Sequence, residues 1–403
     1  MKAVGLIVEY NPFHNGHAHH LNSAKELSNA DIVIAVMSGN FLQRGEPALV
    51  SKWYRANMAL QAGVDLVFEL PYIFATQKAE NFANGAVSIL DAVGCDFLCF
   101  GSENGDIHDF YNTLEFMEER NETYQENIKK HIKTGVSYPK AQALSFEELK
   151  SPQGLVDLSK PNNILGYHYL KAIQSLKSSM APLTVKRKNA DYHDEHFASE
   201  RIASATSIRK ALFSTNEQEI GIDQFIPQTT NALLTDYYRR FGIFHQWENY
   251  YPILQFLLLQ ANPNELREIY EVEEGIENRL IKTAMESNSF REFMEKVKTK
   301  RYTWTRLQRI CLHILTNTKK IQMTSLEQAS YLRLLGMTEN GKEYLNKMKA
   351  HLGLPLISKL SSYKNEDILP DIKASRIYAC VLPNHLKVKS FEEEFKQPPI
   401  YLK

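Results

Sequence analysis

Short apolar runs alternate with segments of helical period over the first 210 residues of the chain. The runs rich in β-branched residues predict buried strands at residues 2–8, 31–37, 64–69, 95–100 and 182–187. Between them, apolar positions three and four apart predict helices at residues 17–28, 51–62, 78–92 and 161–177, with Ser51 and Pro161 as helix starts. Because such alternation is typical of a parallel sheet with right-handed crossovers, we expect an α/β fold with a Rossmann-like parallel sheet.

Helical periods replace the strand pattern after about residue 215. The predicted helical segments are 229–241, 248–261, 263–271, 276–287, 289–299, 303–317 and 325–335. Residues 211–228, with Asn216, Pro227 and several glutamines, are the expected linker. Residues 376–382 (RIYACVL) read as a strand, which allows for a short C-terminal α/β element. We therefore predict two domains, a Rossmann-like one over residues 1–215 and a mostly helical one over residues 216–403.

Composition narrows the class of protein. Of 403 residues, 43% are apolar and 23% charged, and no apolar stretch approaches the roughly 18 to 20 residues of a membrane span. The N-terminus (MKAVGLIVEY) is too short in apolar residues for a signal sequence, so we expect a cytoplasmic protein without a membrane partner. Four cysteines without a CxxC pair argue against a disulfide framework or a zinc ribbon. A net charge of zero argues against a uniformly basic nucleic-acid binder.

The first candidate for chemistry is the turn His14-Asn15-Gly16-His17, directly after the first predicted strand. Gly16 lets the backbone approach a bound group, and the following helix offers free N–H donors to phosphate. Both imidazoles could donate to a nucleotide's triphosphate and stabilise charge as pyrophosphate leaves. Two plainer interpretations stay open: helix capping by the histidines, and a metal site, which lacks an HExxH pattern and a nearby carboxylate. We predict no metal ligands in the chain.

A second candidate is the hydroxyl-rich stretch ahead of the helix predicted to begin at Ile208. Ser204, Thr206 and Ser207 precede Ile208 and Arg209. Hydroxyl groups at a helix start usually cap the backbone and do nothing more. Together with Arg209 and the histidine turn, however, they would form a second anion cradle for the same nucleotide.

These motifs together resemble one family, the bacterial tRNA(Met) cytidine acetate ligases of the HxGH nucleotidyltransferase superfamily. Six stretches carry the resemblance, in this order: GLIVEYNPFHNGHAHHL, VMSGNFLQRGEPALVSKWYRANMAL, VDLVFELP, FGSENGD, KPNNILGYHYLKAI and ASATSIRKAL. It extends weakly into the helical half through KRYTWTRLQRICLHIL. HxGH is shared by many enzymes, whereas SGNFLQRGEPA beside it is far more specific.

The resemblance implies that ATP activates acetate as acetyl-adenylate and that the acetyl group passes to N4 of the wobble cytidine of elongator methionine tRNA. It implies His14 and His17 as catalytic residues and Mg²⁺ as the neutralising ion of the triphosphate. Which of Arg187 and Lys188 reaches phosphate stays open. The implied ATP-binding residues, with the second cradle added, are Ile7, Val8, Glu9, Tyr10, Asn11, Pro12, Phe13, His14, Asn15, Gly16, His17, Ala18, His19, His20, Gly101, Asn162, Arg187, Lys188, Ser207 and Arg209.

Several of these positions also have an ordinary structural interpretation. Gly101 follows a predicted strand, where a backbone passes close to a ligand, yet it could be a turn glycine. Asn162 could cap its helix instead of binding adenine or ribose. Donors in SGNFLQRGEPA, such as Gln43 and Arg44, suit either a carboxylate or the tRNA backbone, and the sequence does not decide between them.

Residues 296–320 are strongly basic and contain no Asp or Glu. Tyr302 and Trp304 within this stretch could stack on exposed bases. A solvated helix face with acidic partners elsewhere in the fold is the plainer interpretation. The candidate tRNA-binding residues are Lys298, Lys300, Arg301, Arg306 and Arg309.

Two other functions remain open from the sequence. A small-molecule adenylyltransferase would use both phosphate cradles but would leave the helical half and the basic stretch without a role. A nucleotide- or RNA-binding protein without catalysis would use the basic stretch but would leave the paired histidines idle.

Overall fold

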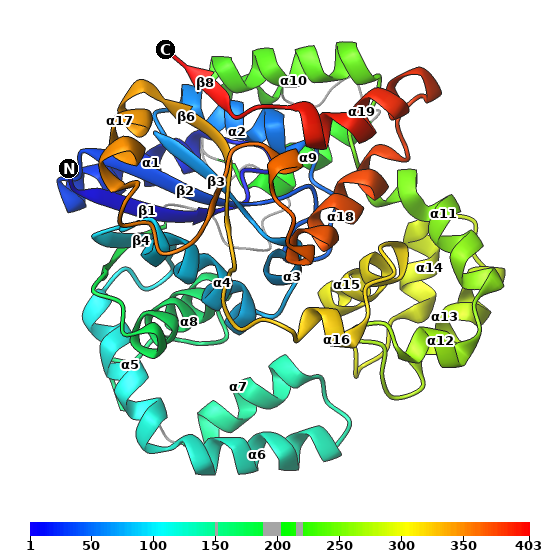
Figure 1. Cartoon of the computed structure of the whole chain (residues 1–403). Helices are drawn as coiled ribbons and strands as arrows, with labels where there is room; N and C mark the ends of the chain where they lie inside the picture. The colour runs from blue at the N-terminus through cyan, green and yellow to red at the C-terminus, as the bar shows by residue number, and fades with distance from the viewer. Residues whose placement is uncertain (150–151, 188–202, 215–220) are drawn as a thin grey trace.

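A mixed sheet of eight strands organises the computed structural model, which describes residues 1–149, 152–187, 203–214 and 221–403 (Figure 1). The strand order is β5-β4-β1-β2-β3-β6-β7, and β8 pairs with β6. β1 to β5 are mutually parallel, whereas β6 runs antiparallel to β3. The strands are β1 (Ala3–Val8), β2 (Ile32–Ser38), β3 (Leu66–Leu70), β4 (Phe97–Ser102), β5 (Ala181–Lys186), β6 (Leu332–Thr338), β7 (Leu356–Ile357) and β8 (Ile400–Leu402).

Helices make up most of the rest of the described chain. Those up to residue 214 are α1 (Asn15–Ser28), α2 (Lys52–Gln61), α3 (Tyr72–Ala75), α4 (Ala79–Ala92), α5 (Ile107–Glu119), α6 (Asn121–Lys133), α7 (Tyr138–Glu148), α8 (Pro161–Leu176) and α9 (Ala205–Phe213). The later ones are α10 (Gln228–Phe241), α11 (Trp247–Gln260), α12 (Pro263–Arg267), α13 (Ile276–Met285), α14 (Phe290–Val297), α15 (Trp304–Leu315), α16 (Lys320–Met323), α17 (Glu339–Met348), α18 (Leu369–Ala379) and α19 (Asn384–Lys396).

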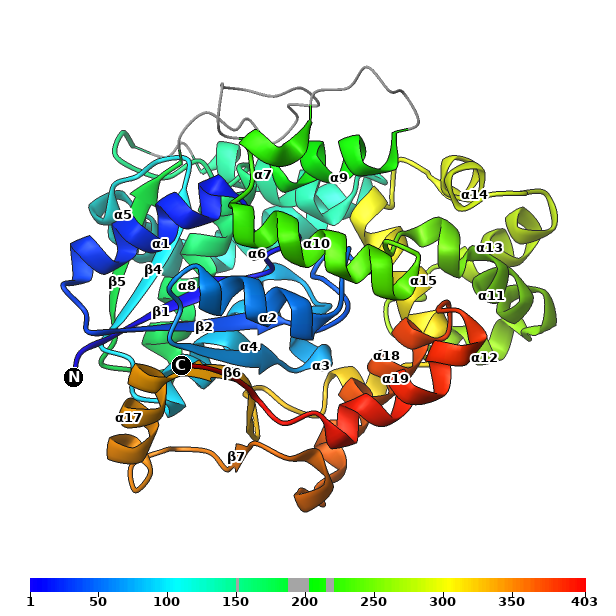
Figure 2. The same cartoon turned by 90° about the horizontal axis from the view of Figure 1, so that it is seen from above.

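Both faces of the sheet are covered by helices. α1, α2 and α10 lie over one face, and α4 and α8 lie under the other (Figures 1 and 2). In β2, Val33 and Ala35 belong to the apolar core that includes residues of α1, α2 and α10, whereas Ile32 and Ile34 belong to the core that includes residues of α4 and α8. Because both faces of the central strands β1 to β4 are buried, these strands are nearly continuous apolar runs, as in other parallel sheets.

The order of strands fixes where a ligand can bind. The chain runs from β1 through β2 to β3 on one side, then returns to β4 on the other side of β1. A crevice therefore opens between the carboxyl ends of β1 and β4, as in other doubly wound sheets. The turn that begins at His14 follows β1, and Gly101 lies near the end of β4.

The strands and helices predicted for the first half are confirmed. Predicted strands correspond to β1 to β5, and predicted helices to α1, α2, α4 and α8. Pro161 opens α8, and Ser51 is the N-cap of α2 although its side chain makes no capping bond. In the second half, α10, α11, α13, α14 and α15 match predicted segments, while only Pro263–Arg267 of the segment 263–271 is helical.

Two assignments in the second half are wrong. Residues 325–335 are not a helix, because β6 begins at Leu332 and pairs with β3, a contact between distant residues that the local period does not encode. Residues 376–382 are not a strand, because α18 extends to Ala379 from a start with Pro370 in its first turn. A short apolar run is compatible with a helix or a strand, so the local pattern alone did not identify the correct structure for either segment.

The chain after residue 330 returns to the sheet of the first half. β6, β7 and β8 extend that sheet beyond β3, so the boundary predicted at 215/216 does not separate two sheets. As a division into domains it stays a prediction. The predicted linker 211–228 overlaps the end of α9 and the start of α10, and its residues 215–220 lie outside the described residues.

A buried charge cluster attaches the C-terminal helix α19 to the sheet. The Lys52 ammonium lies 2.7 Å from carboxylate oxygens of both Glu69 in β3 and Glu394 in α19. The Arg333 guanidinium, in β6, lies 3.6 Å from Glu394. All four side chains are at most 5% exposed, so each charge depends on the others for compensation.

Removal of one member of this cluster should destabilise the whole protein. We expect Glu394→Ala to lower the free energy of unfolding by about 3–5 kcal/mol, because it leaves buried cations uncompensated. Glu392→Ala on the same helix removes only an exposed pair with Lys396 and should cost no more than about 1 kcal/mol. Urea unfolding measures the free energy of unfolding of both variants. Equal losses of stability in the two would contradict the role of the buried charge cluster in attaching α19 to the sheet.

Candidate active site

The turn after β1 holds two histidines in a reciprocal cap of helix α1. The Gly16 N–H donates to His14 Nδ1 at 3.0 Å, and the His14 N–H donates to His17 Nδ1 at 3.3 Å. Each Nδ1 therefore accepts, which places the proton of the neutral ring on Nε2. No described residue bonds to either Nε2 atom, so both histidines offer an Nε2–H donor to a ligand.

Burial keeps these rings uncharged. Desolvation, followed by the charges of Arg187 and Arg209, lowers the pKa of His14 to about 3. The pKa of His17 is lowered well below its usual value by burial first and then by His14 and Arg187. The two rings stack with centroids 3.7 Å apart. Near neutral pH the site thus combines neutral donors with nearby arginine charges, an arrangement suited to phosphate oxygens.

The residues before His14 shape the turn. The rings of Tyr10 and Phe13 pack edge-on at 4.8 Å, and Tyr10 also lies against His17 at 4.9 Å. Asn11 accepts the Leu49 N–H at 2.7 Å and precedes Pro12 through a cis peptide bond. These contacts hold the segment that leads into the two histidines.

The other members of the predicted loop lie along β1 and α1. Ile7 and Val8 end the strand, and the Glu9 carboxylate accepts the Gln43 N–H at 2.9 Å. Asn15 binds the backbone of the segment before α10, through Gln224 and Phe225. Ala18, His19 and His20 follow on α1 and are partly buried, and burial followed by Arg187 lowers the pKa of His20 to about 4.

The structure brings the second anion cradle to the histidine turn. Arg209 donates to the backbone oxygen of Asn11 at 2.9 Å and pairs with Glu46 at 3.0 Å. Ser204 caps α9 by accepting the Ser207 N–H at 3.1 Å, so this part of the capping interpretation holds. Arg209 and the start of α9 therefore lie beside the His14 turn although about 200 residues separate them.

A third group of predicted residues meets at the ends of β4 and β5. Gly101 faces the side chain of Arg187, and the Arg187 guanidinium donates to Asn162 Oδ1 at 3.4 Å. Lys188, the alternative to Arg187, lies outside the described residues. The electrostatic influence of Arg187 on both His14 and His17 joins this group to the turn after β1.

Glu103, which the sequence patterns did not single out, organises this third group. The Glu103 carboxylate accepts from Asn162 Nδ2 at 2.7 Å and from the Asn163 N–H at 2.8 Å, and its charge acts on Arg187. Glu103 thus caps α8 and orients Asn162. A carboxylate directly after a strand, in the quoted stretch FGSENGD, was the signal that could have identified it.

The loop after β2 connects the site to the helices of the second half. Arg44 lies among the charges of Glu9, Glu46 and Arg209. Gly45 has φ +78° and a Cβ there would come within 2.5 Å of the Arg309 backbone nitrogen. Only glycine fits this contact, so α15 packs directly on the loop beside the site.

The predicted tRNA-binding residues divide into two groups. Arg301, Arg306 and Arg309 form ion pairs with Glu274, Glu273 and Glu271 at 3.4, 3.0 and 2.7 Å. Lys298 and Lys300 are exposed and have no ion pair with a described residue. Tyr302 is buried and Trp304 is 38% exposed. The plainer interpretation therefore holds for the three arginines, and tRNA binding by this stretch stays a prediction.

Among residues 1–149, 152–187, 203–214 and 221–403, no three His, Cys, Asp or Glu side chains come together as metal ligands would. No helix in the same ranges combines the length and apolar character needed to cross a bilayer.

Comparison with known proteins matches the chain along its whole length. A family model described as HIGH Nucleotidyl Transferase matches residues 1–394. A tRNA(Met) cytidine acetate ligase of Lysinibacillus sphaericus is 49% identical over 402 residues, which cover 99% of this chain and 100% of the relative.

Two solved structures of TmcAL from Thermotoga maritima also match, each over 100% of both chains. The apo form is 35% identical with a TM-score of 0.91. The form bound with alpha-thio ATP is 34% identical with a TM-score of 0.89. These structures share the mixed sheet and the surrounding helices described above.

The neutral state of His14 should affect stability as the pH falls. An unfolded histidine has a pKa of about 6.5, whereas burial holds that of folded His14 near 3, so between these values only the unfolded chain binds this proton. We expect the free energy of unfolding to fall as the pH is lowered from about 6 to about 4.5, and to fall more steeply in the wild type than in His14→Asn. The difference between the two slopes should be about 1.4 kcal/mol per pH unit. Asparagine retains the helix cap.

Urea unfolding curves at several pH values measure this difference. Parallel pH dependence in the two proteins would contradict a buried, neutral His14.

Proposed function

Because the chain belongs to the tRNA(Met) cytidine acetate ligase family of HIGH nucleotidyl transferases, we propose that it acetylates N4 of the wobble cytidine in elongator methionine tRNA, using ATP and acetate. The observation that carries the proposal is the pair of Nε2–H donors on His14 and His17, beside Arg187 and Arg209 at the crevice between β1 and β4. A relative of the same fold binds an ATP analogue. We expect the enzyme to act in the cytoplasm, where its tRNA substrate is.

The first step would be adenylation of acetate. An acetate oxygen attacks the α-phosphorus of ATP, the bond from that phosphorus to the bridging oxygen breaks, and pyrophosphate leaves. The Nε2–H groups of His14 and His17 would donate to phosphate oxygens as charge develops on them. Arg187 and Arg209 would supply the positive charge that the neutral rings lack.

The second step would transfer the acetyl group to the tRNA. The cytidine N4 amine attacks the carbonyl of the mixed anhydride, AMP leaves, and the amine loses one proton. No acyl-enzyme is needed. Burial raises the pKa of every cysteine in the chain, that of Cys99 to about 12, so none is an activated thiolate.

Mg²⁺ would enter with the nucleotide. The described residues hold no group of three potential ligands, which fits an ion bound mainly by phosphate oxygens and water. Glu9 and Glu46 are the carboxylates beside the Arg209 side of the site. The ion would supply further neutralisation of the triphosphate.

Incorporation of ¹⁴C-acetate into elongator methionine tRNA tests the proposal directly. We expect ATP-dependent label in N4-acetylcytidine after nucleoside analysis, and acetate-dependent exchange of pyrophosphate into ATP. Exchange that requires another acceptor would support a small-molecule adenylyltransferase instead. A protein that binds ATP and catalyses no exchange would be a binding protein, and the proposal would be wrong.

His17 can be separated from its role as a helix cap. We expect His17→Ala and His17→Gln both to lower turnover by about 10² to 10³, the effect of one lost preformed donor. Glutamine is a favoured partner at the third helical position of a capping box, so His17→Gln should retain the thermal stability of the wild type.

Steady-state acetylation rates and thermal melting measure these effects. His351→Gln, an exposed histidine after α17, is the matched control and should keep full turnover. Near-normal turnover in His17→Gln would remove His17 from the catalytic site.

A further inference from the structure

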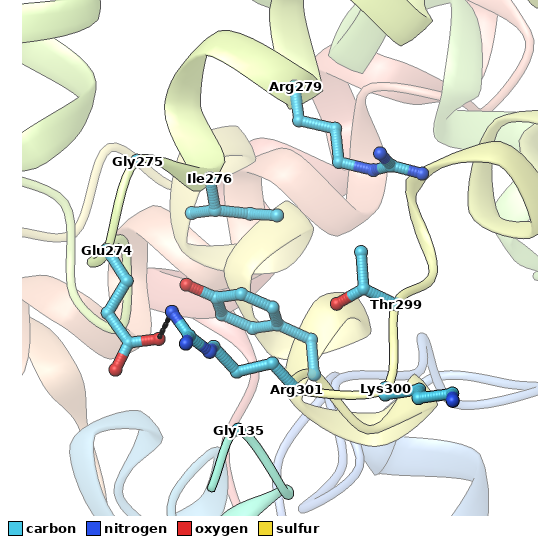
Figure 3. A pocket seen from close by; sticks show the side chains of 9 residues that line it. Gly135, Glu274, Gly275, Ile276, Arg279, Thr299, Lys300 and Arg301 are labelled. Carbon is cyan, nitrogen blue, oxygen red and sulfur yellow. Dashed lines mark ion pairs between the residues drawn. The ribbon is translucent and has the colours of Figure 1, made fainter. Parts of the chain in front are cut away.

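An open hollow lies between the tip of the α6–α7 hairpin and the helical half of the chain. Its volume is about 350 Å³. Gly135, in the turn between α6 and α7, lines one side. Arg279 of α13 and residues 299–302 line the other, as Figure 3 shows. A Cβ at Gly135 would meet no atom within 4 Å, so the hairpin borders free space there.

The basic residues on the helical side retain uncompensated charge. Lys298 and Lys300 are exposed, and neither forms an ion pair within the described chain. Among the described residues, the Arg279 guanidinium donates only to backbone oxygens, those of Val297 at 2.8 Å and of Lys296. These bonds orient the group without neutralising it. The neighbouring Arg301, in contrast, pairs with Glu274 across the hollow (Figure 3).

The hairpin side carries unpaired lysines as well. Residues 127–146 contain Lys129, Lys130, Lys133 and Lys140 and no Asp or Glu. The first three are exposed near the end of α6 and make no ion pair in the part of the chain that the structure describes. Favourable interaction with the helix dipole accounts for lysines in a last turn. It does not account for unpaired lysines both on the helix that leads to Gly135 and in the segment that lines the opposite side of the hollow.

The hollow is connected to the active site through α15. This helix begins at Trp304, directly after the lining residues 299–302, and packs on Gly45 through the backbone of Arg309. At 1.5 Å per residue, the Gly45 contact lies roughly 9 Å along the axis from Thr303. A substrate in the hollow would therefore lie close to the loop beside the nucleotide site.

We propose that this hollow docks the phosphodiester backbone of the tRNA substrate, together with exposed lysines that adjoin its lining in the chain: Lys129 and Lys133 on α6, which leads to Gly135, and Lys298 and Lys300 in the segment that lines the other side. The proposal rests on the proposed function and identifies the surface that the second substrate uses. Exposed lysines spread over two separate segments match a polyanion, because a site for a single free phosphate needs convergent, buried donors. Arg306 and Arg309 are thereby assigned to the internal ion pairs and not to RNA.

Two charge-reversal pairs test the two sides separately. We expect Lys129→Glu with Lys133→Glu, and Lys298→Glu with Lys300→Glu, each to weaken tRNA binding by at least about tenfold. Each pair should also lower the slope of log affinity against log salt by about 2, since each lost lysine–phosphate contact lowers it by about 1. Lys359→Glu with Lys364→Glu is the matched control, because both lysines are exposed, lack ion pairs with described residues and flank the turn after β7.

Fluorescence anisotropy with labelled elongator methionine tRNA measures binding directly, and the KM values for tRNA and for ATP are measured beside it. A higher KM for tRNA at the wild-type KM for ATP supports the docking surface. A higher KM for ATP alone would make the hollow a nucleotide site and overturn the proposal. So would tRNA affinity in both test pairs within twofold of the control pair.

Direct binding also separates this inference from the proposed function. If the wild-type protein binds tRNA without acetylating it and the test pairs weaken that binding, the surface stands and the proposed reaction is wrong. If acetylation occurs and the test pairs bind tRNA as the control does, the reaction stands and the surface is wrong.

Discussion

The reciprocal cap at the start of α1 is the interaction on which the site depends. By accepting backbone N–H groups on Nδ1, His14 and His17 end the turn after β1, begin the helix and fix their own tautomers in one arrangement. The capping role is therefore compatible with the proposed catalytic role. The same bonds that satisfy the helix terminus leave both Nε2–H groups without a bond to a described residue, and burial keeps the rings neutral.

The surrounding loops are held at the same edge of the sheet by buried charges. Arg55 donates to the backbone oxygens of Glu9 and Ser38, at 2.6 and 3.0 Å, and so connects the ends of β1 and β2. The cluster around Lys52 connects β3 to the last helix of the chain. Because buried charges must be compensated, the C-terminal elements cannot separate from the catalytic edge without a large cost. This constraint holds β6 and α19 against β3 and α2.

Acidic residues decide which basic residues remain available to a partner. The segment with Glu271, Glu273 and Glu274 takes up the arginines of the basic stretch, and the lysines beside it stay exposed. The division follows from chemistry, since a guanidinium group forms directed pairs with carboxylates while exposed lysines remain hydrated point charges. The count of charges along the sequence therefore overstated the basic surface around these arginines, and it did not single out the exposed lysines of α6, which form no ion pair with a described residue.

The sequence by itself determined the local features: five parallel strands, their helices, and the histidine turn at the end of β1. These depend on apolar period and turn chemistry within a few residues, which the chain carries in its own order. Only the tertiary structure decided that residues 332–338 pair with β3 as a strand, that Arg209 reaches Asn11, and that Glu103 orients Asn162. These contacts join residues 264 to 271, 198 and 59 positions apart, respectively, and local pattern contains no information about which distant groups will satisfy one another.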